Sequence, residues 1–427
     1  MHRSIATLLF ASALGLHAAT HVERHGALRV SGASIVGEHG QPVQLAGPSL
    51  YWSVWGGQNY YNKDVVAWVA KDWKASLIRA AMAVDVNQTR DKGYLLTPDV
   101  HMGYVKTVVD AAIANGIYVI VDWHDHDGNL HIPQAKVFFD AMAKAYGNTP
   151  NVIWEIWNEP DGKNGTGTNG ADTWSDIRKY SDSIIPVIRA HSKNLIIVGT
   201  PSWSQDVHTA AMSPLPDSNL AYALHFYAGT HGAALRTKGR TALRRNKALF
   251  ITEFGTTTSD GGQHPTTTNP VDNFKIYPES TTVWLDWADS CGLSWANWSL
   301  SNKDEASAAL LKTTTSTAGG WSVDQLSPSG QYIRARLLKM DSIVSTRPAV
   351  VRRLAENAAL KLVGTPDGIA FDVPDGARRA VVRDLSGKLI ASAPLDGARA
   401  QIPLPRGVAI LSIETIHGTL SRRIQRM

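Results

Sequence analysis

The sequence has only one cysteine, Cys291, in 427 residues, which excludes an intrachain disulfide. No histidine and asparagine pattern of a thiol enzyme accompanies it, so we expect Cys291 to be a small buried apolar residue. Charged residues are also few, at 19% against 44% hydrophobic residues, and this composition excludes a disordered chain. A glycine-rich phosphate loop is missing after the first strand-like run, which argues against a nucleotide-binding open sheet.

A metal motif is lacking as well, although acidic residues and histidines gather in WHDHDGNLHIP (123–133). Asp125, Asp127 and Asn129 imitate the first positions of a calcium loop, but the glycine is displaced and the twelfth position is Lys136 instead of glutamate. The histidines have no helical spacing for zinc and no cysteine partner. We predict a polar cleft loop here, with no metal and no cofactor.

Beyond its first residues, the chain has no apolar run of transmembrane length. The start itself joins a short basic segment, His2 and Arg3, to an apolar run and then to small residues. This order is typical of a secretory signal peptide, which we predict over residues 1–19. We therefore expect a protein that is secreted, periplasmic or held at the cell surface, with no membrane span.

Positive charge is concentrated at the end of the chain. The formal net charge is +5, and from Ser342 onward 13 lysines and arginines face only 7 acidic residues. Aromatic residues are not interleaved with these arginines, so we expect no nucleic-acid partner. From about residue 345, apolar and polar residues alternate between Asp-Gly and Ser-Gly turns. This pattern predicts a small, basic antiparallel β-sandwich over 345–427.

Eight apolar runs of strand length recur before that region, and most lack the polar alternation of a half-exposed strand. They occupy residues 43–47, 76–82, 117–123, 152–157, 195–199, 220–226, 248–254 and 293–298. The clearest helix-length amphipathic stretches lie at 66–75, 105–116, 135–147, 173–191 and 281–292, with a final helix at 326–340. This alternation predicts an α/β fold, a (β/α)8 TIM barrel over residues 20–341, with an open doubly wound sheet as the alternative.

Two glutamates each follow an apolar strand-like run: Glu159 in VIWEIWNEP (152–160) and Glu253 in ALFITEFG (248–255). The carboxyl ends of parallel barrel strands converge on one face, so the two side chains can meet there. Two carboxyl groups about 5 Å apart can cleave a glycosidic bond with retention, one as acid/base and the other as nucleophile. Glu155 competes with Glu159 for the acid role, because strand alternation would point both to the same side.

The segment VIWEIWNEP resembles the acid/base motif of glycoside hydrolase family 5, and further segments match that family in order. These are GPSLYW (47–52), LIRAAMAV (77–84), VIVDWH (119–124), LHFYA (224–228), ITEFGT (251–256) and SWANWSLSNKDEASAAL (294–310). The last segment is similar to that of the bacterial endo-β-1,4-glucanases. The resemblance implies a secreted retaining endo-β-1,4-glucanase that acts on cellulose-like glucans by double displacement, with Glu159 as acid/base and Glu253 as nucleophile.

The same resemblance implies a set of substrate-binding residues: Arg79, His124, Asn158, His225, Tyr227, Trp298, Lys303 and Glu305. Pairing with Arg79 would keep Glu253 ionised, and a hydrogen bond from Tyr227 would support it. A largely apolar, tryptophan-rich surrounding would raise the pKa of Glu159. Asn158 would bind the sugar 2-hydroxyl, and Lys303 and Glu305 the next sugar on the non-reducing side.

The chain has 14 tryptophans, and aromatic rings stack on the apolar faces of sugars. Trp298 resembles the family's platform at the cleaved sugar. Trp52, Trp55, Trp123 and Trp203 are further candidates, and packing in the core or at the rim is an equal alternative for each of them. Tyr51 stands where many relatives carry a histidine, so the resemblance does not define which residues contact the distal sugars on the non-reducing side.

We expect a monomer with a β-glucan as its partner. Mannan, xyloglucan and mixed-linkage glucan remain alternative substrates, and a catalytically inactive carbohydrate-binding barrel is the alternative function. The run DLSGKLI, followed by GVAILSIET and a basic end, resembles the C-terminal sorting or attachment modules of some bacterial secreted enzymes.

Overall fold

The computed structural model describes residues 19–161, 173–265 and 271–345, and then the ranges 362–365, 367–373, 377–384, 388–395, 399–403, 407–415 and 418–426. The predicted signal peptide lies outside the described residues except for its last position. Within the described residues, no helix is both long and apolar enough to cross a membrane.

Eight parallel strands close into a barrel, which confirms the predicted (β/α)8 architecture. In chain order the barrel strands are β3 (Ala46–Leu50), β4 (Leu77–Ala83), β5 (Tyr118–His124), β6 (Val152–Glu155), β7 (Ile196–Val198), β8 (Leu220–Tyr227), β9 (Leu249–Gly255) and β10 (Trp295–Leu300). Sequential strands are neighbours, and β10 pairs with β3 to close the ring. Each of the eight predicted runs overlaps one of these strands.

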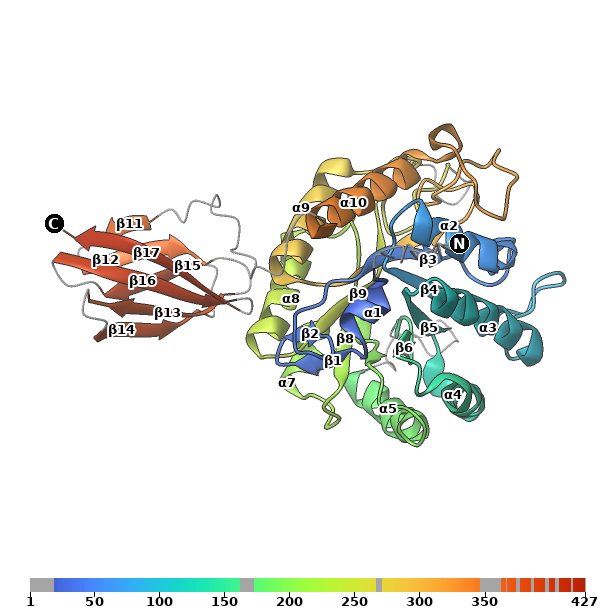
Figure 1. Ribbon diagram of the computed structural model, residues 1–427, viewed down its shortest axis with the longest axis horizontal. Helices are drawn as coiled ribbons and strands as arrows, with labels where there is room; N and C mark the ends of the chain where they lie inside the picture. Colours follow the sequence, from blue (N-terminus) through green and yellow to red (C-terminus); the bar gives the residue numbers. More distant parts are fainter. Residues whose placement is uncertain are drawn as a thin grey trace, which may run out of the picture.

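Helices follow most of the barrel strands and surround them (Figure 1). They are α1 (His21–His25), α2 (Lys63–Lys71), α3 (Pro98–Ala114), α4 (Ile132–Tyr146), α5 (Trp174–Arg189), α6 (Pro201–Ser204), α7 (Val207–Met212), α8 (Ala233–Arg244), α9 (Pro278–Cys291) and α10 (Pro328–Ser345). The six predicted helices correspond to α2, α3, α4, α5, α9 and α10. Local signals set their ends: Thr173 and Asp176 form a capping box at the start of α5, and Gly292 ends α9 in a left-handed conformation at φ 65°.

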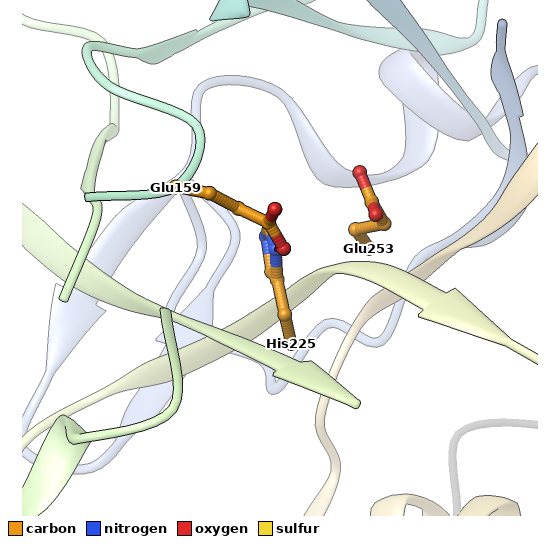
Figure 2. Close-up of side chains that lie close together, drawn as sticks. All are labelled: Glu159, His225 and Glu253. Carbon is orange, nitrogen blue, oxygen red and sulfur yellow. Dashed lines mark hydrogen bonds and ion pairs between the residues drawn. The ribbon is translucent and has the colours of Figure 1, made fainter. Parts of the chain in front are cut away.

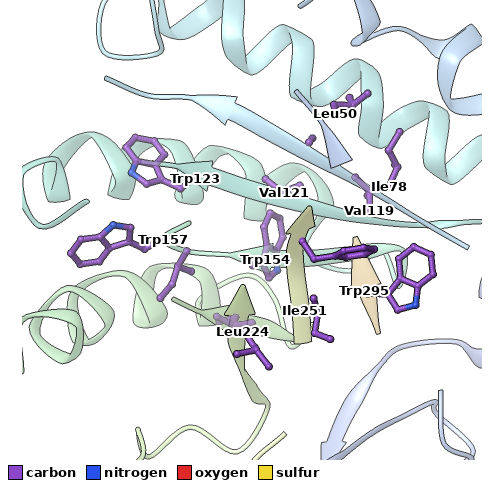
Figure 3. Packing of buried hydrophobic residues seen from close by; sticks show 14 of the residues in the cluster. Leu50, Ile78, Val119, Val121, Trp123, Trp154, Trp157, Leu224, Ile251 and Trp295 are labelled. Atoms are coloured by element: carbon purple, nitrogen blue, oxygen red, sulfur yellow. The ribbon is translucent and has the colours of Figure 1, made fainter. Parts of the chain in front are cut away.

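Alternate residues of each strand serve two different cores. In β4, Ile78 packs outward in the large cluster between strands and helices, whereas Leu77 packs inside the barrel. Trp154 and Val121 belong to the same outer cluster, which Figure 3 shows between the strands and the surrounding helices. Side chains alternate along a strand with a period of two, so the residue two positions after an inward apolar residue also points into the barrel. It lies nearer to the carboxyl end of the strand. Arg79 occupies such a position, two residues after Leu77.

A hairpin of β1 (Arg29–Ser31) and β2 (Ser34–Val36) closes the amino-terminal end of the barrel. Leu28 and Ile35 from this region pack with Leu77 and other inward residues. Val43 and Leu45 belong to the same cluster. The start of the predicted first strand, at 43–47, is therefore corrected. The apolar run begins as part of this end cluster, and the strand starts only at Ala46.

Strand β9 contains a bulge just before its carboxyl end. Phe250 pairs with Ala223 of β8, yet the next registered pair is Glu253 with His225, so β9 has one extra residue there. The pairing of β9 with β10 shifts over the same stretch. A bulge changes the alternation of side chains and is common beside active sites. It lets Thr252 and Glu253, although adjacent, both contact residues of the barrel interior.

The C-terminal region contains the predicted antiparallel strands. One sheet has the order β11-β12-β15 and the other β14-β13-β16-β17. Their bounds are β11 (Leu362–Thr365), β12 (Gly368–Asp372), β13 (Ala377–Arg383), β14 (Leu389–Pro394), β15 (Arg399–Pro403), β16 (Gly407–Thr415) and β17 (Gly418–Arg426). Phe371 and Ile402 of the first sheet pack with Val382 and Leu411 of the second, so the two sheets share one apolar core.

Candidate active site

A cavity of about 180 Å³ opens at the carboxyl ends of the barrel strands. It is lined by Tyr51, Trp52, His124, His126, Glu159, Tyr227, Glu253, Ser259, Asp260, Gly261, Gln263, Trp298, Lys303 and Glu305. A larger cavity of about 290 Å³ lies near the amino-terminal ends of β8 and β9, beside Leu220 and Ala248. That end of a barrel serves stability, and the predicted catalytic residues all line or border the smaller cavity.

Glu159 reaches this cavity from a loop. Strand β6 ends at Glu155, and the backbone N–H of Glu159 donates to the carbonyl of Asp125, 3.3 Å away at the end of β5. The expected alternation of Glu155, Trp157 and Glu159 along one strand is therefore wrong. Trp157 packs outward in the large core cluster, whereas Glu155 is buried inside the barrel beside Arg79.

Glu253 reaches the cavity from the bulge of β9. One of its carboxylate oxygens accepts a hydrogen bond from Arg79 at 2.9 Å, and the other accepts one from the Tyr227 hydroxyl at 2.7 Å. Both partners were expected from the sequence. Since two donors hold the carboxylate, its free lone pairs have a fixed direction toward the cavity.

The two glutamates lie close together. One carboxylate oxygen of Glu159, one of Glu253 and a ring nitrogen of His225 all lie within 4.8 Å of one another. Figure 2 shows the side chains of Glu159 and His225 meeting, with Glu253 beside them. Three such ligands could also hold a metal ion. However, the guanidinium of Arg79 already supplies positive charge to Glu253, and a pair of opposed carboxyl groups accounts for the cluster.

Arg79 is the centre of a buried ionic network. Its side chain is fully buried and contacts Asp122 at 2.9 Å, Glu155 at 2.8 Å and Glu253 at 2.9 Å. It also donates to the Asn158 side-chain oxygen at 2.6 Å. Burial acts to lower the pKa of Arg79, but the three carboxylates outweigh it and raise that pKa, so the guanidinium stays charged. One side chain thus fixes the positions of four others.

His225 lies between Glu159 and the barrel interior. Its Nδ1 is 2.8 Å from a Glu159 oxygen, and its Nε2 is 2.8 Å from the Thr252 hydroxyl. Burial acts to lower the pKa of His225, but Glu155 and Glu159 outweigh it and raise that pKa to about 9. The imidazole is therefore a protonated partner for Glu159 at neutral pH.

The pKa values of the two glutamates correct the sequence expectation. Burial acts to raise the pKa of Glu159, but hydrogen bonds from His126 and His225 outweigh it and lower that pKa to about 2. The surroundings of this carboxyl group are histidines rather than the apolar tryptophans that we expected. Burial and the nearby charge of Glu159 raise the pKa of Glu253 despite its contact with Arg79. The pKa values of Glu159 and His225 assign the proton of this pair to the histidine.

An aromatic wall lines the side of the cavity next to the glutamates. The ring of His124 stacks on Trp298 with centroids 5.1 Å apart, and Trp52 meets His124 edge-on at 4.1 Å. Asp122 holds the Nδ1 of His124 at 2.7 Å. Burial and the charge of Arg79 lower the pKa of His124 well below its usual value, so this ring is neutral. A neutral stacked ring is suited to contact a sugar.

Of the remaining predicted residues, Lys303 and Glu305 line the cavity, and Asn158 precedes Glu159 in the chain and contacts Arg79. Asn158 is buried, and its side-chain nitrogen has no hydrogen-bond partner in the described part of the chain. Such a donor is costly to bury unpaired, so a ligand hydroxyl is a natural acceptor for it. Lys303 pairs with Glu305 at 3.0 Å and donates to the Tyr51 hydroxyl, which stands in place of the family's histidine.

The four further tryptophan candidates do not share one environment. Trp52 lines the cavity, and Trp55 and Trp203 are each 38% exposed. Trp123 is fully buried against Phe138 and Phe139 in the outer core, so it cannot stack on a sugar. Trp123 therefore takes the core alternative, because Trp123 and His124 are adjacent on β5 and point to opposite sides of the strand.

Four functional neighbours were not predicted: Asp122, Glu155, His126 and Thr252. Asp122 and Glu155 hold Arg79, while His126 and Thr252 surround the Glu159–His225 pair. A signal existed for the first two, because each is a charged residue inside an apolar strand run, and buried charges need partners. No comparable signal marks His126 or Thr252, since both depend on the local shape of a loop or bulge.

A closed parallel barrel with two carboxyl groups this close at its carboxyl end defines the class of barrel glycoside hydrolases. The family model described as cellulase, glycosyl hydrolase family 5, matches residues 36–304. Endoglucanase A of Evansella cellulosilytica is 45% identical over 316 residues, which cover 72% of this chain and 59% of that protein. Endoglucanase N of Pectobacterium atrosepticum is 44% identical over 324 residues, covering 75% and 67%. The chain belongs to the cellulase family, glycosyl hydrolase family 5.

Solved structures agree with this assignment. The catalytic domain of an endoglucanase from Thermobifida fusca is 32% identical with a TM-score of 0.65, and the match covers 75% of this chain and 100% of that one. A form of that domain was solved in complex with cellotetraose. The chain spans about three-fifths to two-thirds of the length of the two curated relatives named above.

Replacing Arg79 by methionine should destabilise the protein strongly. The change leaves three buried carboxylates without their shared cation, and breaking a buried pair in this way costs about 3–5 kcal/mol. Chemical denaturation at pH 7 measures the difference. Arg334→Met is the matched control, because its bidentate pair with Asp72 is partly exposed and should contribute less than about 1 kcal/mol. Equal effects of the two changes would contradict the central role of Arg79.

Proposed function

We propose that this chain is a retaining endo-β-1,4-glucanase that hydrolyses internal bonds of cellulose-like glucans by double displacement. The observation that carries the proposal is the spacing of the carboxyl groups, whose nearest atoms lie within 4.8 Å. Retaining glycosidases place their carboxyl groups about 5–5.5 Å apart, whereas inverting ones need about 6.5–9.5 Å to admit a water molecule between them. The spacing supports retention.

In the first step, a Glu253 oxygen attacks the anomeric carbon while Glu159 donates a proton to the leaving glycosidic oxygen. The carbon–oxygen bond to the leaving sugar breaks as the bond to Glu253 forms. In the second step, Glu159 takes a proton from water, which attacks the same carbon and releases Glu253. Arg79 and Tyr227 support the nucleophile, because they hold its carboxylate from both sides.

The proton for the first step comes from the Glu159–His225 pair. Without substrate, this proton is held on the imidazole, 2.8 Å from the carboxylate of Glu159. A bound glucan displaces water from the cavity, which disfavours the charged form of Glu159 and returns the proton to it along the same hydrogen bond. The pair as a unit is therefore the acid, and His225 acts by positioning and holding the proton.

The substrate contacts follow from the surroundings of the pair. Trp298 and His124 form the stacking wall, and the side-chain amide nitrogen of Asn158, unpaired among the described residues, donates a hydrogen bond to the sugar 2-hydroxyl. Lys303 and Glu305 bind the next sugar on the non-reducing side. The named endoglucanases among the relatives support a β-1,4-glucan over the other polymers.

The organisation of the whole chain is part of the proposal. Residues 20–341 form the catalytic domain, and residues 345–427 form a small basic β-domain. The apolar start of the sequence directs the protein out of the cytoplasm, so that it meets its polymer outside the cell or at its surface.

Soluble carboxymethyl cellulose, assayed beside β-mannan, xyloglucan and mixed-linkage glucan, tests the proposed activity. We expect rapid loss of viscosity on the cellulose derivative, because internal bonds are cut. Glu253→Ala should reduce the rate on the order of 10⁴-fold or more while leaving the fold intact. Preference for another polymer would keep the mechanism and assign that polymer as the substrate. Absence of activity on all four polymers would favour a catalytically inactive, carbohydrate-binding barrel.

The pKa values predict a bell-shaped dependence of kcat/KM on pH. Glu253 must be ionised, and because its pKa is raised above the ordinary 4.5, we expect the acidic limb above that pH. The Glu159–His225 pair must keep its proton, so we expect the basic limb near pH 9, where the imidazole loses it.

His225→Gln tests the assignment of the basic limb. Without the imidazole the proton must rest on Glu159 alone, so this limb should move toward the range of an ordinary glutamate. His191→Gln is the control, because that histidine pairs with Asp140 at the surface and should leave both limbs in place. A basic limb that stays near pH 9 in His225→Gln would assign it to another group.

A further inference from the structure

Two aromatic rings on the loop after β9 stack on each other at the solvent-exposed surface. The rings of His264 and Phe274 are parallel within 4°, and their centroids are 3.9 Å apart. Phe274 is 40% exposed, and the His264 side chain is 55% exposed. The pair belongs to neither described core cluster of the barrel. Because stacking covers only one face of each ring, the exposed area lies on the outer faces and edges.

This pair stands at the rim of the catalytic cavity. Gln263, which precedes His264, lines the cavity together with Asp260. Asn273, which precedes Phe274, donates its backbone N–H to the Gln263 carbonyl at 3.1 Å and its side-chain amide to Asp260 at 2.8 Å. The segment that carries His264 therefore includes a residue of the cavity lining, and the segment that carries Phe274 is hydrogen-bonded to that lining.

The position along the cavity is also defined. The Nε2 atom of His264 lies 3.7 Å from a carboxylate oxygen of Asp304. In the sequence, Asp304 stands between Lys303 and Glu305, and both of these residues line the cavity. The ring pair thus continues the cavity on the side of Lys303 and Glu305.

The base of this loop is held firmly. Gly261 and Gly262 have φ angles of 84° and 70°, a region that favours glycine. Their carbonyls accept backbone hydrogen bonds from Ser307 at 3.0 Å and Ala306 at 2.9 Å. A side chain at Gly262 would lie 2.9 Å from the Ala306 Cβ. The segment leading to His264 is therefore fixed against the loop after β10, and the rings keep a defined place at the rim.

We propose that His264 and Phe274 form a distal subsite for a glucose unit of a β-linked glucan, beyond the sugar held by Lys303 and Glu305. The inference rests on the proposed function, which supplies the direction of the chain through the cavity. Glucose presents apolar C–H faces to aromatic rings, and a ring that is already ordered binds them without a further loss of side-chain entropy. The subsite takes the third or fourth sugar on the non-reducing side.

Chromogenic aryl β-glycosides of cellobiose, cellotriose and cellotetraose test this subsite, because they place two, three or four sugars on the non-reducing side. We expect Phe274→Ala to lower kcat/KM roughly 3- to 10-fold on the tetraoside or on both longer substrates. Hydrolysis of the bioside should not change. The control Val283→Ala alters another exposed apolar residue, on α9, and should leave all three substrates unaffected.

Two results would overturn the subsite. If Phe274→Ala slows the bioside as much as the longer substrates, the ring supports the loop and does not bind a sugar. If all three rates stay unchanged, no sugar contacts the ring. If the unaltered protein hydrolyses none of the three substrates, the proposed function fails, and calorimetry with cellotetraose then tests the subsite separately. The subsite predicts that cellotetraose binds roughly 3- to 10-fold more weakly to Phe274→Ala than to the unaltered protein. Equal binding to the two proteins would reject the subsite.

Discussion

The buried guanidinium of Arg79 is the interaction on which the rest of the site depends. It contacts carboxylates from three other barrel strands, Asp122 of β5, Glu155 of β6 and Glu253 of β9. Each of these carboxylates would be costly to bury alone, so they are tolerated only around a shared cation. The network also fixes Asn158 and, through Asp122, the ring of His124. Charge pairing across the barrel interior therefore sets the geometry in which the chemistry takes place.

Two local irregularities bring Glu159 and Glu253 onto this network. The bulge in β9 turns both Thr252 and Glu253 inward, so that Glu253 contacts Arg79 while Thr252 contacts His225. The early end of β6 places Glu159 on a loop that is fastened to β5. A regular barrel with strict alternation would bury one of these side chains in the outer core. The carboxyl spacing that supports retention is thus a product of irregular backbone on a regular scaffold.

The amino-acid pattern was sufficient for the barrel strands, because buried parallel strands read as continuous apolar runs. It was also sufficient for the main helices, and for the antiparallel C-terminal sheets, whose apolar and polar residues alternate between turns. It missed α8, whose sequence AALRTKGRTALR is mostly polar and carries Gly239 against Trp287. Family resemblance named the site residues, and the structure brings them together at one cavity. Which of the two glutamates has the lower pKa could not be predicted from the sequence, because it depends on how His126 and His225 approach Glu159 in space. The sequence left Trp123 open between the cavity and the core, and the structure places it in the core, because adjacent strand residues face opposite sides.

We propose that two carboxyl groups held by this network cleave a glucan with retention. Proton NMR of the first minutes of hydrolysis of a cello-oligosaccharide tests it most directly, because the anomeric configuration of the new reducing end is visible before mutarotation. We predict that the β-anomer appears first and the α-anomer grows only later. Initial formation of the α-anomer would show inversion, and it would contradict the assignment of Glu253 as a nucleophile.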